Sequence, residues 1–451
     1  MTRIVIVGAG GMTFPLALAS DLLTQPTLQG ATLVLYDPDP VRAGRTARAA
    51  REVAGAHGRT LELQVTEDRR AALRGATHVL LTYQIGGLDA YRADLEIPHR
   101  YGVDCVAGDT LNPGGIMRFV RSSASFEVLA QDLAELCPDA LVINYTNPMA
   151  MNTLFLAGLG MRVVGLCHSI PGTAEVIAQL LGVDQEALVY RAAGINHQAW
   201  FLRLEAYGVD QQGALRTALG ERFLPGSGGT TPWTEGGATY AGGQERVRAE
   251  LMETFGYFTS ESSHHASEYV PYFRRSPESV KAHLPRRWDY LRTAQASAGQ
   301  EDALVACSVG RLSRDLRPSG EWAMPLIAAM GGGEPADIYV NVRNDGWIAN
   351  LPAEACVEVP ARVDASGIRP AQAGRLPGAC AGLNLTGIAL QTAVVDAVVS
   401  RDPAGLLAAF ALDPLTASQL DLSDIRAMAR EVLQAQRPWL PGWLGGPEVQ
   451  A

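Results

Sequence analysis

Short apolar runs alternate with helical segments along the first part of the chain. Each run is rich in Val, Ile and Leu, which is typical of a β-strand. The predicted strands are 3–7, 33–37, 61–65, 77–83, 140–145 and 161–167. The helical segments between them are 14–23, 40–56, 67–74, 119–136 and 173–181. Strands that alternate with helices predict a parallel, doubly wound sheet, which we place at residues 1–190.

The pattern changes after residue 190. Residues 225–245 are rich in Gly, Thr and Pro without periodicity, which predicts a long loop. Helical pattern returns later, and two further strands follow it. The predicted helices are 245–255, 277–300, 385–411 and 413–436, and the predicted strands are 337–344 and 355–363. We therefore expect an α+β domain at residues 191–440, which carries substrate and metal and mediates oligomerisation, and a Pro/Gly-rich tail at 441–451.

Composition narrows the class of protein. Of the 451 residues, 47% are hydrophobic and 19% are charged, as in an ordinary globular enzyme. The net charge of −10 argues against a nucleic-acid partner or an anionic membrane surface. We read no signal peptide and no apolar run long enough to span a membrane, so we expect a cytoplasmic protein. The six scattered cysteines are expected to be free thiols.

A glycine-rich loop follows the first strand and opens the first helix. It comprises Gly8, Gly10, Gly11, Met12 and Thr13. Gly8 permits the tight turn, and Gly10 lets the backbone approach a pyrophosphate at the helix N-terminus. Asp37 ends the second strand, where a ribose-binding acid belongs, so NAD is favoured over NADP. The pattern predicts a Rossmann-like domain similar to lactate and malate dehydrogenases, and the alternative is a tight turn without a cofactor.

Polar residues stand at the predicted ends of three further strands. They are Asn147, Cys167 and His197. In doubly wound sheets, ligands bind at the carboxyl ends of the strands. A thiolate and a neutral imidazole are good ligands for a divalent metal, and two such ligands leave an open, catalytic site. A buried thiol beside a hydrogen-bonded histidine is the alternative.

Several strings together resemble glycoside hydrolase family 4. They are "GDTLNPGGIMR", "VINYTNPMAMNT", "GLCHS", "AGINH", "ESSHHASEYVPYF" and "GWIANLPAEACVEVP", in the right order from Gly8 to about Pro360. The resemblance is to the branch that acts on non-phosphorylated sugars, which contains melibiase-like α-galactosidases and related α-glucosidases and uronidases. The family stands apart from most glycosidases, because it depends on NAD instead of a pair of carboxylates.

The resemblance implies a cofactor, a metal and a mechanism. The family uses NAD and a divalent metal, commonly Mn²⁺, held by a Cys and a His that match Cys167 and His197. Hydride leaves C3 of the sugar, a base removes the C2 proton, and the glycosidic oxygen is eliminated. Water then adds and the hydride returns. We expect a homodimer or homotetramer that acts on a small-molecule glycoside.

Individual roles are assigned by matching the family's motifs. Tyr269 is the expected C2 base, with His265 and Glu261 as alternatives, although a tyrosine in a core is also consistent with the pattern. His168 either protonates the leaving group or lines the site. The expected substrate-binding residues are Asn147, Asn196, Arg118, His264 and Asn344, and Asn147 is also expected to touch the nicotinamide ribose. A turn at Asn147 and a surface salt bridge at Arg118 are the structural alternatives.

Rival functions remain open at this point. The sugar is either neutral, as in an α-galactoside, or anionic, as in a uronide or a sulfonated sugar. Arg118, Arg274 and Arg275 are candidate anchors for an anionic group. An NAD-dependent dehydrogenase of sugars or hydroxy acids is a second class of function, and a non-enzymatic regulator that binds NAD or sugar is a third.

Overall fold

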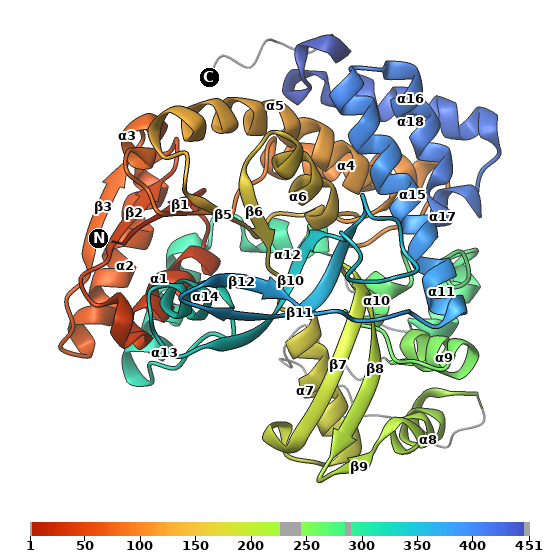
Figure 1. The fold of residues 1–451 in the computed structure, drawn as a ribbon. Coiled ribbons are helices and arrows are strands. Elements are labelled where there is room, and N and C mark those ends of the chain that lie inside the picture. Colours follow the sequence, from red (N-terminus) through yellow and green to blue (C-terminus); the bar gives the residue numbers. More distant parts are fainter. Residues whose placement is uncertain (1, 226–244, 285–289, 446–451) are drawn as a thin grey trace.

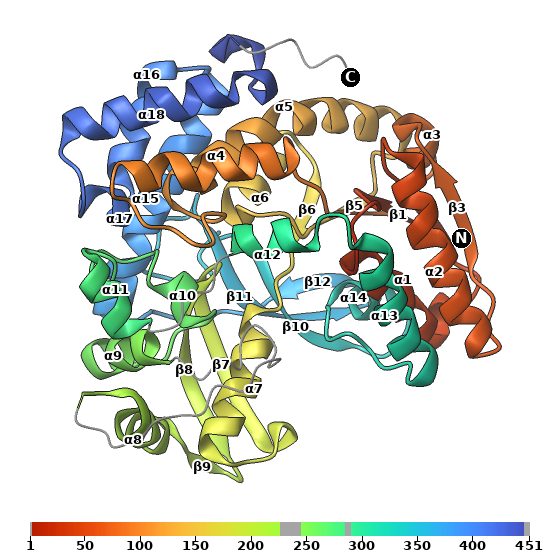
Figure 2. The same cartoon turned by 180° about the vertical axis from the view of Figure 1, so that it is seen from behind.

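A computed structural model describes residues 2–225, 245–284 and 290–445 of the chain. One mixed sheet runs through these residues, with helices packed on both faces (Figures 1 and 2). Six strands form its parallel half in the order β3-β2-β1-β4-β5-β6. They are β1 (Arg3–Val7), β2 (Thr32–Tyr36), β3 (Glu62–Thr66), β4 (His78–Leu81), β5 (Leu141–Asn144) and β6 (Arg162–Gly165). This order is that of a dinucleotide-binding doubly wound sheet, so the predicted fold class is confirmed.

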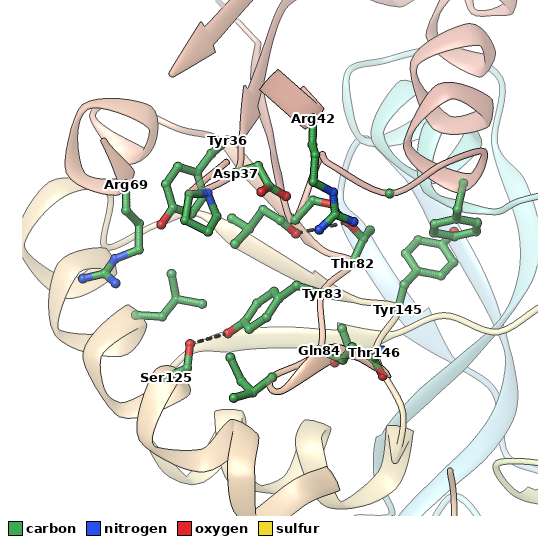
Figure 3. Close-up of a pocket in the computed structure, with 18 of the residues that line it drawn as sticks. Tyr36, Asp37, Arg42, Arg69, Thr82, Tyr83, Gln84, Ser125, Tyr145 and Thr146 are labelled. Atoms are coloured by element: carbon green, nitrogen blue, oxygen red, sulfur yellow. Dashed lines mark hydrogen bonds between the residues drawn. The ribbon is translucent and has the colours of Figure 1, made fainter. Parts of the chain in front are cut away.

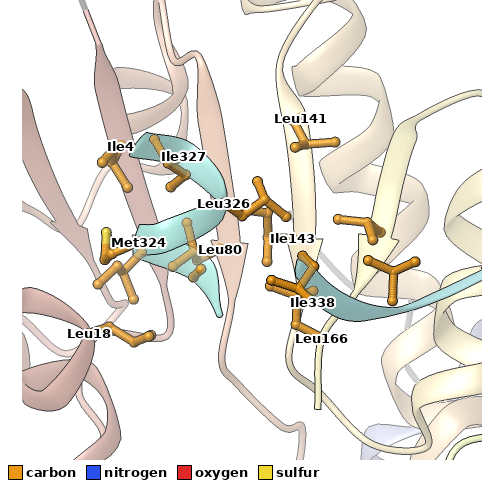
Figure 4. Close-up of a cluster of buried hydrophobic side chains, with 14 of the residues drawn as sticks. Ile4, Leu18, Leu80, Leu141, Ile143, Leu166, Met324, Leu326, Ile327 and Ile338 are labelled. Carbon is orange, nitrogen blue, oxygen red and sulfur yellow. The ribbon is translucent and has the colours of Figure 1, made fainter. Parts of the chain in front are cut away.

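Alternate residues of β1 face the two sides of the sheet. Ile4 and Ile6 join one core, and Val5 and Val7 join the other. Figure 4 shows the first core, where Ile4 and Leu80 meet Leu18 and Met324. The helices on this face are α1 (Phe14–Thr24), α2 (Pro40–Ala56), α13 (Glu301–Arg314) and α14 (Ala323–Met330). The opposite face carries α3 (Arg69–Leu73), α4 (Gly87–Arg100), α5 (Asn112–Leu136) and α6 (Met149–Gly158).

The other half of the sheet is antiparallel. A hairpin of β10 (Ala336–Arg343) and β11 (Cys356–Asp364) lies between β6 and β7 (Leu188–Ile195). Beyond β7 lie β8 (Gln198–Ala206) and β9 (Val209–Asp210), while β12 (Gly367–Pro370) pairs with β11. The β7–β8 hairpin and the helices α4, α6, α8, α13 and α14 were not predicted. The expected mixture of helices and short strands after residue 190 is confirmed, but the sheet is continuous across that point, and the division into two domains stays a prediction.

Two predicted helices are each interrupted. The segment 385–411 forms α15 (Gly378–Ser400) and α16 (Pro403–Ala409), because Arg401 takes a left-handed conformation and Asp402 caps the second helix. The segment 413–436 forms α17 (Pro414–Ala417) and α18 (Leu422–Gln436), since Asp421 begins a new helix. The remaining helices are α7 (Ser169–Leu181), α8 (Gln212–Phe223), α9 (Arg246–Phe255), α10 (Ser263–Ala266), α11 (Pro277–His283) and α12 (Tyr290–Ser297). The helices α11 and α12 replace the single helix predicted at 277–300.

Three expectations about the surface and the cysteines can be compared with the structure. The predicted loop at 225–245 lies almost wholly outside the described residues. In the tail, Trp443 and Leu444 pack against the second core. All six cysteines are free, as predicted.

One helix, α15, is long and apolar enough to cross a membrane by length and composition alone, which the sequence analysis did not anticipate. It buries Asn384 and Gln391, and the Asn384 amide contacts Gln198 and Trp200. Buried polar contacts of this kind are those of a helix inside a folded core.

Candidate active site

A cavity of about 650 Å³ opens at the carboxyl ends of β1, β2, β4 and β5 (Figure 3). Its walls come from the glycine loop after β1, from Asp37 after β2, from the segment after β4 and from the segment after β5. The residues that close it include Gly8, Gly11, Phe14, Asp37, Thr82, Tyr83, Gln84, Arg118, Tyr145, Thr146 and Asn147. The position is where doubly wound sheets bind dinucleotides.

The glycine loop is shaped by close backbone packing. Gly8 has a φ of +94°, and a Cβ there would lie 2.6 Å from Cβ of Tyr83. The Gly10 amide donates to Oδ2 of Asp37 at 2.8 Å, and a Cβ on Gly10 would lie 2.6 Å from the same oxygen. Both positions therefore need glycine. Met12 and Thr13 complete the loop before α1, but they are not among the residues that line the cavity.

Asp37 lies at the edge of the cavity with both carboxylate oxygens held by backbone. Oδ1 accepts from the Asp39 amide at 3.0 Å, while Oδ2 accepts from Gly10. Each oxygen keeps a free lone pair, as a ligand of ribose hydroxyls requires. This geometry fits the predicted role in binding NAD.

Asn147 joins this cavity to a second group of polar residues. It lines the cavity, and its Nδ2 donates to Oδ2 of Asp109 at 3.0 Å. Arg118 lies 3.8 Å from the same oxygen, and its side chain is 14% exposed. Arg118 is thus a partly buried cavity residue, which rules out the surface salt bridge considered above.

His197 and Tyr269 meet in the second group. Tyr269 Oη lies 3.2 Å from Nδ1 of His197, and Thr110 Oγ1 lies 2.9 Å from the same nitrogen. Thr110 donates its single hydroxyl proton to Asp109. With its proton on Nδ1, His197 would donate to this pair of hydroxyls and keep the lone pair of Nε2 for a metal; with Nδ1 unprotonated, the Tyr269 hydroxyl would donate to it instead.

His265 on α10 and Glu261, two residues before that helix, complete the group. His265 Nδ1 lies 3.4 Å from Glu261 and its Nε2 lies 3.8 Å from Asp109, while Glu261 lies 3.8 Å from Nε2 of His197. Both His197 and Glu261 have positive φ values, 64° and 69°. Such backbone is costly for residues with a Cβ and clusters at functional sites. The buried Arg248 guanidinium holds Glu261 in place by donating to its carbonyl oxygen.

Charges within the group set its ionisation. Burial alone would raise the pKa of Asp109, but His265, Arg118 and His197 outweigh it and hold the pKa at about 2. Burial also opposes the charge on Glu261, yet His265 and His197 lower its pKa. Burial raises the pKa of Tyr269 well above its usual range, with Asp109 adding to the effect. The lowered pKa expected of a base at this position therefore needs the positive charges of a bound ion and nicotinamide.

Sequence reasoning missed Glu268, which organises the loop that carries Asp109. Its buried carboxylate accepts from the amides of Val106, Ala107 and Gly108 at 2.6, 3.0 and 3.1 Å. Arg274 lies 3.9 Å from this carboxylate and donates to Asp104 at 3.1 Å. The charge of Arg274 is thus balanced by Asp104 and Glu268, and its contacts stabilise the loop that carries Asp109. The string of consecutive backbone donors has no signature in sequence, because it forms between segments far apart in the chain.

Two donor sets could hold a divalent metal, and both include His197. Cys167 follows β6 and is buried, and burial raises the pKa of its thiol to about 12, with Glu358 as the largest charge influence. A metal would displace the thiol proton, as it does at thiolate sites. The alternative set is Asp109, His197 and His265, whose ligand atoms lie within 4.8 Å of one another. The free Nε2 of His197 fits an ion in either case, and the assignment of Cys167 stays a prediction.

His168 is held by an acid that the sequence did not reveal. Its Nδ1 lies 2.9 Å from Glu321, and its ring is 46% exposed. Burial disfavours its charge, but the hydrogen bond to Glu321 outweighs burial and raises its pKa above the usual value. His168 thus presents a positioned imidazole at the start of α7. This geometry is compatible with either role predicted for it.

The other predicted substrate residues differ in what they contact. Asn196 is buried, and neither of its amide atoms has a partner among the described residues. His264 is buried beside His265 on α10. Asn344 instead serves its own loop, since it donates to the carbonyls of Ile348, Leu351 and Pro352 and accepts from the Ile348 amide. Its amide is fully engaged, so this geometry gives no support to substrate binding by Asn344.

Comparison with known proteins shows where the chain belongs. The model of "Family 4 glycosyl hydrolase" matches residues 3–183, and that of "Family 4 glycosyl hydrolase C-terminal domain" matches residues 192–416. The chain is 33% identical to an alpha-galactosidase of Bacillus subtilis (strain 168), over 98% of this chain and 99% of the relative. It is 30% identical to an alpha-galacturonidase of the same organism, over 96% and 97%.

A solved structure has the same fold. It is a 6-phospho-alpha-glucosidase from gut microorganisms in complex with NAD and Mn²⁺, with a TM-score of 0.80 and 23% identity, over 98% of this chain and 99% of that one. The resemblance stated from the motifs is confirmed by the two family models and by both relatives. The chain is a glycosidase that belongs to family 4 of the glycosyl hydrolases.

Proposed function

We propose that the chain hydrolyses a non-phosphorylated α-glycoside with the help of NAD and a divalent metal, Mn²⁺ or a similar ion. The observation that carries the proposal is the contact between Asn147 and Asp109, which places the dinucleotide cavity next to the His197–Tyr269 group. The likeness to a structure that contains NAD and Mn²⁺ supports the same cofactors. A cytoplasmic location and assembly as a homodimer or homotetramer stay predictions.

The residues divide the work of the reaction. Bound NAD would take a hydride from C3 of the sugar and return it later, and the bound ion would polarise the O2 and O3 oxygens. Tyr269 removes the C2 proton. Its hydroxyl lies 3.2 Å from Nδ1 of His197, which stabilises the phenolate when that nitrogen carries a proton. His168 protonates the leaving oxygen, and Glu321 fixes the direction of its ring.

The charges of the site favour a neutral sugar. Among the described residues, three buried or partly buried arginines near the site each lie close to an acid: Arg118 to Asp109, Arg248 to Glu245, and Arg274 to Asp104. Each still has one N–H group without a hydrogen-bond partner among these residues. None of the three therefore carries an unbalanced positive charge that would select a carboxylate or sulfonate of the substrate. We therefore favour an α-galactoside, the substrate class of the first relative, over the galacturonide of the second.

Hydrolysis in D₂O tests the mechanism directly. Elimination and water addition rebuild C2, so the product sugar should carry deuterium at C2 and hydrogen at C3, and NADH should not accumulate. Proton NMR of the product, after a screen of neutral and anionic aryl α- and β-glycosides, measures both. A fully protonated C2 would overturn the proposed route, and steady NADH production would instead indicate a dehydrogenase.

A further inference from the structure

Glu358 is a buried acid for which the reaction described above has no use. It lies on β11 with no exposed surface, and its Oε1 accepts from Nδ2 of Asn341 at 3.1 Å. Its other oxygen, Oε2, has no hydrogen-bond partner among the described residues, and neither does Oδ1 of Asn341. Two buried oxygens thus stand side by side without a donor.

The register of the sheet places this pair between the strands that lead to the predicted metal ligands. Asn341 pairs with Glu358 across the β10–β11 hairpin. Asn341 also pairs with Gly165, two residues before Cys167, and Glu358 also pairs with Gly194, three residues before His197. The strands β6 and β7 therefore end near the same line of paired residues across the sheet. Asn341 and Glu358, which carry the two oxygens, lie in the middle of this line.

Close packing keeps this line of paired residues in place. A Cβ on Gly165 would lie 2.9 Å from Cβ of Asn341, so only glycine lets the amide sit beside β6. Glu358 is also the largest charge influence on the Cys167 thiol, and His197 is the largest on Glu358. Glu358 therefore interacts electrostatically with both predicted metal ligands, Cys167 and His197.

A carboxylate in this position needs a positive partner. Within the described ranges, no Lys or Arg forms an ion pair with Glu358, and the positive groups that influence it are His197 and His168. Without an ion, a protonated Oε2 could donate to the unpartnered Oδ1 of Asn341, whereas a bound cation would satisfy the carboxylate itself. An unpaired polar atom buried this deeply is costly unless a ligand satisfies it. Carboxylate and amide oxygens on strands that lead to a thiol and an imidazole suit a divalent cation such as Mn²⁺.

We propose that Glu358 belongs to the divalent-ion site as a positioning residue, which balances the charge of the ion and is itself held by Asn341. This inference rests on the proposed function, since it assumes that an ion binds at Cys167 and His197. It adds a negative charge to a site whose predicted protein ligands supply only one, the Cys167 thiolate. Outer partners of this kind commonly change metal affinity by roughly 10- to 100-fold.

The test is a titration of the chelator-treated full-length protein with Mn²⁺ alone, followed by electron paramagnetic resonance of the free ion. Glu358→Gln removes the charge but keeps the bond from Asn341, because the amide oxygen can replace Oε1. It should raise the Mn²⁺ Kd at least fivefold and leave the NAD Kd within twofold. Glu358→Asp keeps the charge and should weaken Mn²⁺ less than Glu358→Gln. Glu354→Gln, the same change at an exposed site before β11, is the control and should have no effect.

The outcomes separate this inference from the function on which it rests. A rise of less than fivefold in Glu358→Gln, or equal weakening by the Asp and Gln variants, would overturn the role of Glu358. If Cys167→Ser loses Mn²⁺ in the same assay, the metal-dependent function stands even then. A wild-type protein that binds no Mn²⁺ would overturn both. Thermal unfolding gives a second reading: Mn²⁺ should raise the Tm of Glu358→Gln by less than it raises that of the wild type.

Discussion

Asn147 reaches across from the dinucleotide cavity and donates to Asp109 at 3.0 Å. Asp109 in turn accepts from Thr110, which contacts His197, so one chain of hydrogen bonds leads from the dinucleotide cavity to the predicted metal ligand His197. A change at either end of this chain is expected to affect catalysis more than binding, because the contacts fix relative positions.

Tyr269→Phe tests the base. The phenyl ring keeps the packing but cannot accept a proton, so kcat should fall by about 10²–10⁴-fold. The Kd values of NAD and Mn²⁺ should stay within a few-fold of the wild type. Tyr290→Phe is the matched control, since this ring also packs against His265 at 5.3 Å. Equal losses in the two variants would assign Tyr269 to packing.

Cys167→Ser and His265→Asn distinguish the two metal donor sets. If Cys167 is a ligand, its removal should weaken Mn²⁺ by orders of magnitude, while His265→Asn has a smaller effect. NAD affinity, measured by calorimetry, should be nearly unchanged in both, because neither residue lines the dinucleotide cavity. The reverse ranking would assign the ion to Asp109, His197 and His265. Full activity in the presence of a chelator would remove the metal from the mechanism.

Asp37→Ala should weaken NAD binding by about 10- to 100-fold and narrow the preference over NADP. The variant loses hydrogen bonds to the ribose that are worth roughly 1.5–3 kcal/mol each when one partner is charged. It also removes the repulsion of a 2′-phosphate. Asp39→Ala is the control, because Asp39 caps α2 through the amides of Val41 and Arg42. An unchanged NAD Kd in Asp37→Ala would show that Asp37 does not bind the ribose.

Glu268→Gln should destabilise the loop that carries Asp109 and Thr110. One of the two oxygens becomes a donor that faces the Gly108 amide, and the buried mismatch should cost about 1–3 kcal/mol. We expect a lower Tm together with a lower kcat, because Asp109 moves relative to Asn147. A lower Tm with normal kcat would show that Glu268 supports the fold alone.

The stability of the protein should depend on pH through Asp21. Burial raises the pKa of this carboxyl from 3.8 to about 6, against hydrogen bonds from Ser319 that lower it. Because the folded protein binds the Asp21 proton more tightly than the unfolded chain, protonation contributes its full stability below about pH 4. This contribution is lost as the pH rises through about 6. The difference in Tm between Asp21→Asn and the wild type should therefore be more in favour of the variant at pH 7.5 than at pH 4.5. Equal differences in Tm at the two pH values would contradict this.

The parallel half of the fold was predictable because local signals agree there. Most of its strands are apolar runs that end at a glycine or polar residue, as at Gly8 and Asp37; the edge strand β3 is the exception, being largely exposed. The β7–β8 hairpin was missed because polar and charged residues such as Arg191 and Arg203 interrupt its apolar pattern. α4 was missed because its sequence is mostly polar and contains Pro98. Tertiary packing, which sequence patterns do not show, stabilises both.

The candidate site was predictable only where a motif carries it. Gly8, Cys167, His197 and Tyr269 stand in recognisable strings. Glu268 and Glu358 lie within two of these strings and Glu321 lies in none, but no string shows what the three acids contact. Glu268 accepts from the distant Val106 amide, Glu321 contacts His168, and Glu358 lies on a strand that pairs with Gly194. Such contacts form only after the sheet has closed, and a single sequence does not show them.

The position of the β10–β11 hairpin has a consequence for synthesis of the chain. Its two strands fill the middle of the sheet, yet they are made after both of their neighbours, β6 and β7. Until Asp364 has left the ribosome, the facing edges of β6 and β7 have no strand to pair with, and open edges invite pairing with other chains. The strand edges beside Cys167 and His197 therefore pair late, and a nascent chain that stops before β11 leaves an unpaired edge next to the predicted metal ligands.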